Sequence, residues 1–210
     1  MSLRSLLLAS ALALVVSVPV AEAKTFKWAN DGDVNSMDPY ARQESFLLTF
    51  TGNIYEPLVR RNAKLQLEPA LAVEWKQIAP TTWRFKLRPG VKWQDGTPFT
   101  ADDVIFSYQR ASGPGSNVGG DFISVKEMKK VDDLTVDIET KIVDPIFVDQ
   151  ITAWGIMSKA WAHAHNAEQT ADLTKQGENF ATRNAMGTGP YMLKSREPDV
   201  KTVLVSNPNW

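Results

Sequence analysis

Residues 82–104 constrain the fold of this chain more than any other part of its sequence. Trp83, Phe85 and Leu87 alternate with basic residues, which predicts a strand with one apolar face. Asp95 and Gly96 form a dipeptide typical of a hairpin turn. Thr100, followed three residues later by Asp103, has the pattern of a capping box and predicts a helix that begins there. The segment therefore predicts a sheet joined directly to a helix.

The remaining periodic segments predict a mixed α/β (α+β) fold class. Period-two alternation predicts strands over residues 25–29, 134–139, 191–193 and 202–205. A helical pattern includes Phe46, Leu47, Phe50 and Ile54 and ends at Pro57, and residues 160–177 predict one or two more helices. Strands and helices do not alternate regularly, so a purely βαβ architecture is not predicted.

The N-terminus is typical of a secretory signal peptide. Arg4 precedes an apolar run over residues 6–18, and Ala21, Glu22 and Ala23 form a small-x-small cleavage site. The run is shorter than the roughly 20 residues that span a bilayer. We expect residues 1–23 to be removed after Ala23. The mature protein would then work in the periplasm without membrane insertion.

Composition narrows the possible functions. The chain has no Cys among its 210 residues, so it has neither a disulfide framework nor a thiol for a lipid anchor. Its formal net charge is −1, which gives no support for binding to nucleic acid. Hydrophobic residues make up 43% of the sequence, enough for a core.

No motif predicts a catalytic, metal or cofactor site. His163 and His165 are the only histidines, and two residues apart on a helix they cannot share a metal. The loop that begins at Asp31 lacks the acidic twelfth residue of a calcium loop, because Arg42 stands there. Gly187 and Gly189 lack the rest of a dinucleotide fingerprint. We therefore expect no enzyme activity. A secreted hydrolase stays open only if a His lies beside a Ser and an Asp.

Several segments occur in an order that resembles a known family. They are 35–39, 54–59, 67–75, 82–104, 187–191 and 207–210. This order is similar to that of the dipeptide/oligopeptide-class extracellular solute-binding proteins of ABC importers, solute-binding protein family 5. The resemblance extends over residues 24–210, and the 82–104 run is its most specific part.

The resemblance implies a periplasmic-binding-protein-like fold with two lobes. Residues 24–57 would form a first-lobe segment, 58–185 an inserted subdomain of that lobe, and 186–210 the return to it. Members of this class are much longer, so we expect this chain to be an N-terminal portion that lacks the C-terminal lobe. Residues 24–210 alone would then bind ligand weakly or not at all.

The resemblance also implies three segments that face the ligand. The candidate ligand-binding residues are Gln43, Glu44, Ser45, Asn117, Val118, Ala153, Trp154 and Gly155. The first group could offer a backbone edge to an extended peptide, and the second lies in a glycine-rich loop. For Trp154 a place in the site and a place in the core remain open alternatives.

The implied function is capture of di- and oligopeptides for import. The partners would be a peptide or other small solute and an inner-membrane ABC permease complex, with the binding protein a monomer. Two alternatives stay open. A member of the same family could bind another solute, such as a nickel chelate, haem, glutathione or an opine. A truncated paralogue would take no part in transport.

Overall fold

The computed structural model describes residues 25–29, 32–175 and 177–210, and the chain divides into two compact units, 1–31 and 32–210. The predicted signal peptide lies outside the described residues. Residues 25–29 form no strand, so that prediction is wrong. Alternation supplies one apolar face, but a strand also requires a neighbouring strand for its backbone hydrogen bonds.

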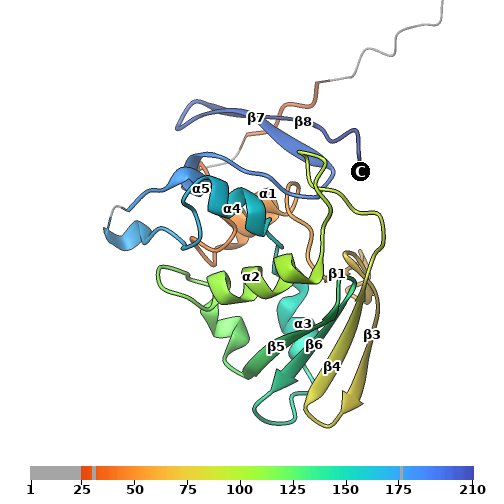
Figure 1. Ribbon diagram of the computed structural model, residues 1–210. Helices are drawn as coiled ribbons and strands as arrows, with labels where there is room; N and C mark the ends of the chain where they lie inside the picture. Colours follow the sequence, from red (N-terminus) through yellow and green to blue (C-terminus); the bar gives the residue numbers. More distant parts are fainter. Residues whose placement is uncertain (1–24, 30–31, 176) are drawn as a thin grey trace, which may run out of the picture. The chain divides into compact units, whose positions relative to one another are not determined.

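A four-stranded antiparallel sheet is the largest element of the unit that contains residues 32–210 (Figure 1). Its strands are β3 (Ala72–Ala79), β4 (Thr82–Leu87), β5 (Val125–Asp132) and β6 (Thr135–Thr140), in the order β3-β4-β6-β5. The predicted strand that contains Trp83, Phe85 and Leu87 is confirmed as β4, and the strand predicted at 134–139 is confirmed as β6.

The two faces of this sheet differ as the alternation predicts. Phe85 on β4 lies opposite Val136 on β6, and both are fully buried in the core. On the other face Arg84 lies opposite Asp137, and two guanidinium nitrogens each contact a carboxylate oxygen at 2.7 Å. Such cross-strand pairs hold the register, because a slip of one residue would exchange the two faces.

Helix α2 (Ala101–Ala111) begins where the capping box predicts, and it packs against β5 and β6. The Asp103 carboxylate accepts a hydrogen bond from the Thr100 backbone N–H at 2.9 Å. The preceding turn places Gly96 at φ 85°, a conformation that favours glycine. Between β4 and this turn the strand does not continue, since only Lys92 and Pro98 pair there.

Short elements make up the rest of this unit. They are α1 (Ser45–Thr51), β1 (Val59–Arg61), β2 (Leu67–Pro69), η1 (Gly119–Phe122), α3 (Phe147–Gln150), η2 (Ile151–Ala153), α4 (Lys159–Ala164), η3 (Leu173–Lys175), α5 (Phe180–Arg183), β7 (Tyr191–Glu197) and β8 (Lys201–Ser206). Strands β1–β2 and β7–β8 form two antiparallel pairs. The prediction for 160–177 is confirmed in part, as α4 and the single turn η3.

One hydrophobic cluster connects these elements, and Met37, Ile54, Trp93 and Ile151 lie within it with at most 1% of their surface exposed. Gly187 contributes to it by close packing. A Cβ at this position would lie 1.9 Å from the Ile54 carbonyl oxygen. The glycine that resembles a nucleotide motif is therefore required for packing.

Candidate functional site

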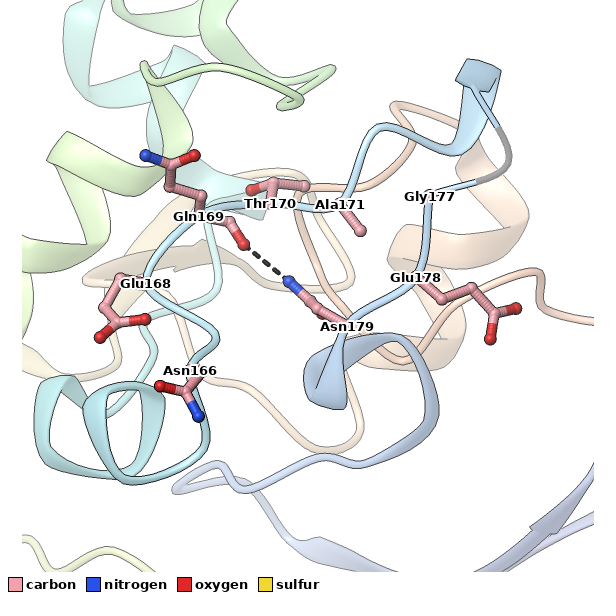
Figure 2. Close-up of a pocket in the computed structure, with 8 residues that line it drawn as sticks. All are labelled: Asn166, Glu168, Gln169, Thr170, Ala171, Gly177, Glu178 and Asn179. Atoms are coloured by element: carbon pink, nitrogen blue, oxygen red, sulfur yellow. Dashed lines mark hydrogen bonds between the residues drawn. The ribbon is translucent and has the colours of Figure 1, made fainter.

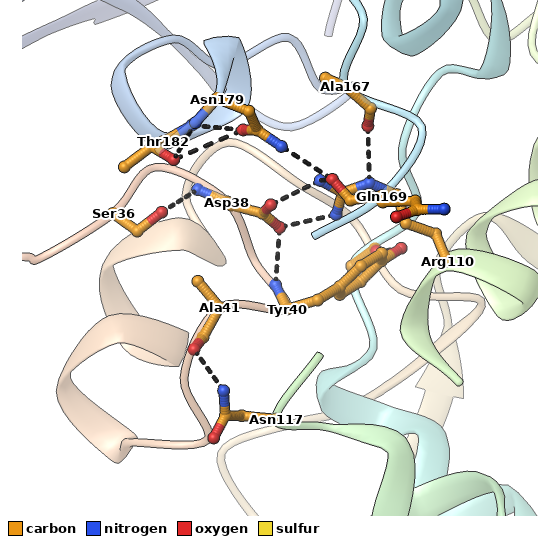
Figure 3. A network of polar contacts seen from close by, with 11 residues as sticks. Ser36, Asp38, Tyr40, Ala41, Arg110, Asn117, Ala167, Gln169, Asn179 and Thr182 are labelled. Atoms are coloured by element: carbon orange, nitrogen blue, oxygen red, sulfur yellow. Dashed lines mark hydrogen bonds and ion pairs between the residues drawn. The ribbon is translucent and has the colours of Figure 1, made fainter. Parts of the chain in front are cut away.

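A buried ion pair fixes the loop that precedes α1. Asp38 and Arg110 lie 72 residues apart in sequence, and their side chains are at most 1% exposed. Arg110 Nη1 and Nη2 contact the two Asp38 carboxylate oxygens at 2.8 and 2.5 Å. Figure 3 shows this pair at the centre of a polar network. The pair ties the loop to helix α2.

The other donors of Arg110 are also satisfied. Its Nε donates to the Ala167 carbonyl at 2.9 Å, and Nη2 donates to the Gln169 carbonyl at 3.2 Å (Figure 3). Its guanidinium carbon lies 5.3 Å from the centre of the Tyr40 ring. Burial alone would lower the pKa of Arg110, but the Asp38 carboxylate raises it, so the guanidinium stays charged.

A small cavity lies beside this network. Its volume is about 10 Å³, close to what one water molecule requires. Its lining residues come from the loop before α1, from α1 itself, from η1 and its N-cap, and from the segment after α3: Pro39, Tyr40, Leu48, Val118, Asp121, Phe122, Ala153 and Trp154. Phe122 and Trp154 meet edge to face with ring centres 4.9 Å apart.

The structure brings together residues from all three predicted segments. Val118, Ala153 and Trp154 line the cavity. Gln43 reaches it through Asp121, because the Gln43 side-chain amide donates to Asp121 Oδ1 at 2.9 Å. Trp154 is 4% exposed, and its indole Nε1 is buried without a hydrogen bond. Trp154 is thus both a core residue and a wall of the cavity.

The other predicted residues do not line the cavity. The side chains of Glu44 and Ser45 are exposed. Asn117 supports the fold, since its side-chain amide donates to the Ala41 carbonyl at 2.8 Å. Gly155 is packed so closely that a Cβ would lie 2.7 Å from the Tyr55 Cβ, and its carbonyl accepts the Tyr40 hydroxyl at 2.7 Å.

Sequence reasoning missed Tyr40, Asp121 and Phe122. Burial raises the pKa of the Tyr40 hydroxyl well above its usual range, so it remains a neutral donor. Burial also raises the pKa of Asp121, and the hydrogen bond from Gln43 partly offsets this. The one available signal was an acidic and an aromatic residue directly after two glycines in a loop.

A larger, open hollow lies elsewhere on this unit (Figure 2). Its volume is about 620 Å³, and it is lined by Asn166, Glu168, Gln169, Thr170, Ala171, Gly177, Glu178 and Asn179. Its two acidic side chains already pair, Glu168 with His163 and Glu178 with Arg183. None of the predicted ligand-binding residues lies there. We therefore place the candidate site at the smaller cavity.

The two histidines do not form a hydrolytic triad. His163 Nδ1 lies 3.1 Å from Glu168, and His165 Nδ1 lies 2.8 Å from the Trp161 carbonyl. Over residues 25–29, 32–175 and 177–210 no group of three His, Asp or Glu side chains is arranged to hold a metal ion. Within the same ranges no helix is long and apolar enough to cross a membrane.

Comparison with known proteins identifies the family. The profile of the bacterial extracellular solute-binding proteins, family 5 (middle part), matches residues 66–210, which is more than half of the chain. The chain belongs to this family. Its members are solute-binding proteins, which supports a binding role for the chain.

Two curated relatives illustrate the similarity. The chain is 30% identical over 177 residues to the periplasmic murein peptide-binding protein MppA of Escherichia coli, covering 75% of this chain and 31% of that protein. It is 31% identical over 194 residues to the glutathione-binding protein GsiB of Pectobacterium atrosepticum, covering 90% of this chain and 35% of that protein.

A solved structure supports the fold. The solute-binding protein MoaA from A. tumefacien R10, in complex with mannopinic acid, superposes with a TM-score of 0.71 at 30% identity. The match covers 85% of this chain and 36% of that one. The mixed α/β, periplasmic-binding-protein-like fold is thus confirmed. The chain spans about a third of the length of these relatives.

Proposed function

We propose that this chain captures peptides in the periplasm for an ABC importer. The protein would be exported by the signal peptide at residues 1–23 and would act as a monomer with an inner-membrane permease complex. Lobe closure around the solute would accompany capture, with no covalent step. We also propose the division of the first lobe at 24–57, 58–185 and 186–210.

The observation that carries this proposal is the convergence of three distant segments at one cavity. The loop before α1, the η1 loop and the segment after α3 are tied together by the Gln43–Asp121 hydrogen bond and by the Phe122–Trp154 contact. Loops that meet on a packed scaffold are typical of binding sites, and the cavity of about 10 Å³ marks their meeting point and has room for one water. The family membership makes the bound species a solute.

A peptide is favoured as the solute by the chemistry of the cavity wall. Trp154 Nε1 is a buried donor without an acceptor, and the Asp121 carboxylate is an acceptor close to the surface. A peptide carries N–H groups that match the Asp121 carboxylate, and one water in the cavity of about 10 Å³ would bridge a peptide carbonyl to Trp154 Nε1. The relative that is named for glutathione favours a second candidate, a glutathione-type solute.

A blocking variant tests the proposal. Ala153 is exposed and lines the cavity, so Ala153→Trp should fill its mouth without disturbing the core. Ala160 is exposed on α4 and does not line the cavity, which makes Ala160→Trp the matched control. The purified product of the whole gene would be titrated calorimetrically with a mixture of di- and tripeptides.

We expect the wild type and Ala160→Trp to bind peptide and Ala153→Trp to lose affinity at least about tenfold, equivalent to roughly 1.4 kcal/mol. Mass spectrometry of co-purified solute would identify the class of ligand independently. Failure of the wild type to bind any peptide, together with co-purified glutathione, would replace the first candidate by the second. Equal loss in both variants would remove the cavity from the binding site.

A further inference from the structure

One arginine differs from all the others that the structure describes. There are eight of them, and seven form an ion pair with a carboxylate: Arg60, Arg61, Arg84, Arg88, Arg110, Arg183 and Arg196. Within residues 32–175 and 177–210 no carboxylate pairs with Arg42. This arginine is therefore the exception to a consistent pattern.

The side chain of Arg42 is not simply extended into solvent. The residue is partly buried, and its Nε is fully buried without a hydrogen-bond partner. A buried donor that is left unpaired destabilises the protein more than a satisfied donor stabilises it. The Nε of Arg196 is unpaired as well, but Arg196 binds Asp33 through its two other nitrogens. Arg42 differs because it has no carboxylate partner among the described residues, which leaves its guanidinium open to a carboxylate from outside the chain.

Arg42 also lies beside the candidate site. Its neighbours on both sides are bound to the loop that contains η1: the Ala41 carbonyl accepts the Asn117 amide, and Gln43 donates to Asp121. Asp121 is the charged residue that lines the cavity, and its Oδ1 accepts a hydrogen bond from the Gln43 side-chain amide at 2.9 Å. Asp121 forms no ion pair with Arg42.

We propose that Arg42 binds a carboxylate of the captured solute. This inference rests on the proposed function and specifies the ligand: the solute must carry a free carboxylate near the cavity. A guanidinium presents parallel N–H groups that match the two oxygens of a carboxylate, and an ammonium does not. The carboxylate can come from a peptide C-terminus or from an acidic side chain.

Three peptide probes separate these sources. They are trialanine with a free C-terminus, trialanine amide, and Ala-Glu-Ala amide, whose only carboxylate is in its side chain. Each would be titrated against the whole gene product and against Arg42→Gln and Arg42→Lys. The matched control is Arg60→Gln, which removes an arginine that is exposed and paired with Glu68 on β1 and β2.

We expect the wild type to bind at least one carboxylate-bearing probe about tenfold more tightly than trialanine amide. Arg42→Gln should lower the affinity for that probe to the level of the amide and leave the amide itself unchanged. Arg42→Lys should recover only part of the loss. Arg60→Gln should behave as the wild type.

The inference is overturned if the wild type binds all three probes equally, or if Arg42→Gln weakens the amide as much as the free acids. Either result leaves peptide binding intact, so the proposed function would survive. Absence of binding to every probe would overturn the proposed function and this inference with it. The two failures are therefore distinguishable in one set of titrations.

Discussion

The surroundings of Arg110 and of Arg42 belong to the same part of the fold, yet they differ in how their polar groups are satisfied. The side chain of Arg110 is fully buried, and all three of its guanidinium nitrogens donate hydrogen bonds, to the Asp38 carboxylate and to the carbonyls of Ala167 and Gln169. Beside the cavity, Arg42 Nε and Trp154 Nε1 are buried donors without acceptors. Buried polar groups are nearly always bonded, so an unbonded donor close to a candidate site is a place where a ligand can add the missing acceptor.

The comparison teaches that charge and burial alone do not identify a binding residue. By sequence, both are arginines near apolar residues. In the structure Arg110 connects the loop at 36–41 to α2 and to the chain after α4 (Figure 3). Arg42 forms no ion pair or side-chain hydrogen bond within the described ranges. Replacing the arginines of this unit one at a time should therefore separate effects on the stability of the fold from effects on ligand binding.

The largest expected effect is that of Arg110→Leu. It would leave the Asp38 carboxylate buried and unpaired, and two carbonyls would lose their donors. We expect the free energy of unfolding to fall by about 3–5 kcal/mol, measured by denaturant titration. A double variant with Asp38→Asn should recover part of the loss, because no uncompensated charge remains. A loss no larger than that of an exposed substitution would contradict the assigned role.

Arg196→Gln should have an intermediate effect. Arg196 binds the Asp33 carboxylate with two nitrogens at 3.0 Å and also contacts the Val34 carbonyl, but the Asp33 side chain is 28% exposed. Water therefore screens this pair more than Asp38–Arg110, and we expect a loss of about 1–2 kcal/mol. The contact joins the loop at 33–34 to β7.

The same pair predicts a pH dependence. Burial alone would raise the pKa of Asp33, but hydrogen bonds from Arg196 and from the Asp199 backbone N–H outweigh it and hold the pKa below its usual value. The stabilisation is thus present above about pH 4 and is lost as the pH falls through the lowered pKa. Unfolding measured between pH 6 and pH 2.5 should show a smaller acid-induced loss in Arg196→Gln than in the wild type.

Local patterns predicted much of the fold. The alternation at 83–87 and the capping box at Thr100 depend on contacts between near neighbours, and both are confirmed. The strand predicted at 25–29 is wrong, because a single alternating segment does not supply its own hydrogen-bonding neighbour. Such patterns did not predict where the short helices after residue 159 begin and end.

The candidate site was predictable only in outline. The convergence of the three segments at the cavity requires contacts over long sequence separations, such as the 78 residues between Gln43 and Asp121. Sequence alone gives Arg110 no reason to be buried, because its partner Asp38 is 72 residues away. Arg42 was missed for the opposite reason: the absence of a partner is visible only once all the other partners are placed.

Arg84→Gln should change stability less than Arg196→Gln. Arg84 and Asp137 form a well-aligned pair, but they lie on the open face of the sheet, and pairs in water contribute little. We expect a small fall in the unfolding midpoint at low ionic strength that disappears in 1 M salt, where the screening length is about 3 Å. A salt-insensitive loss would mean that the pair acts through packing of the arginine stem.

The smallest expected effect on stability is that of Arg42→Gln, since this substitution breaks no ion pair or hydrogen bond among the described residues. We expect the melting temperature of the ligand-free protein to stay unchanged or to rise slightly, because a buried unpaired donor is removed. Addition of a carboxylate-bearing peptide at 100 times its dissociation constant should stabilise the wild type by about 2.7 kcal/mol and the variant by much less. A clear loss of stability without ligand would instead make Arg42 a structural residue like Arg110. The contrast between the two arginines would then be one of degree, and the missing acceptor would have to lie within the protein itself.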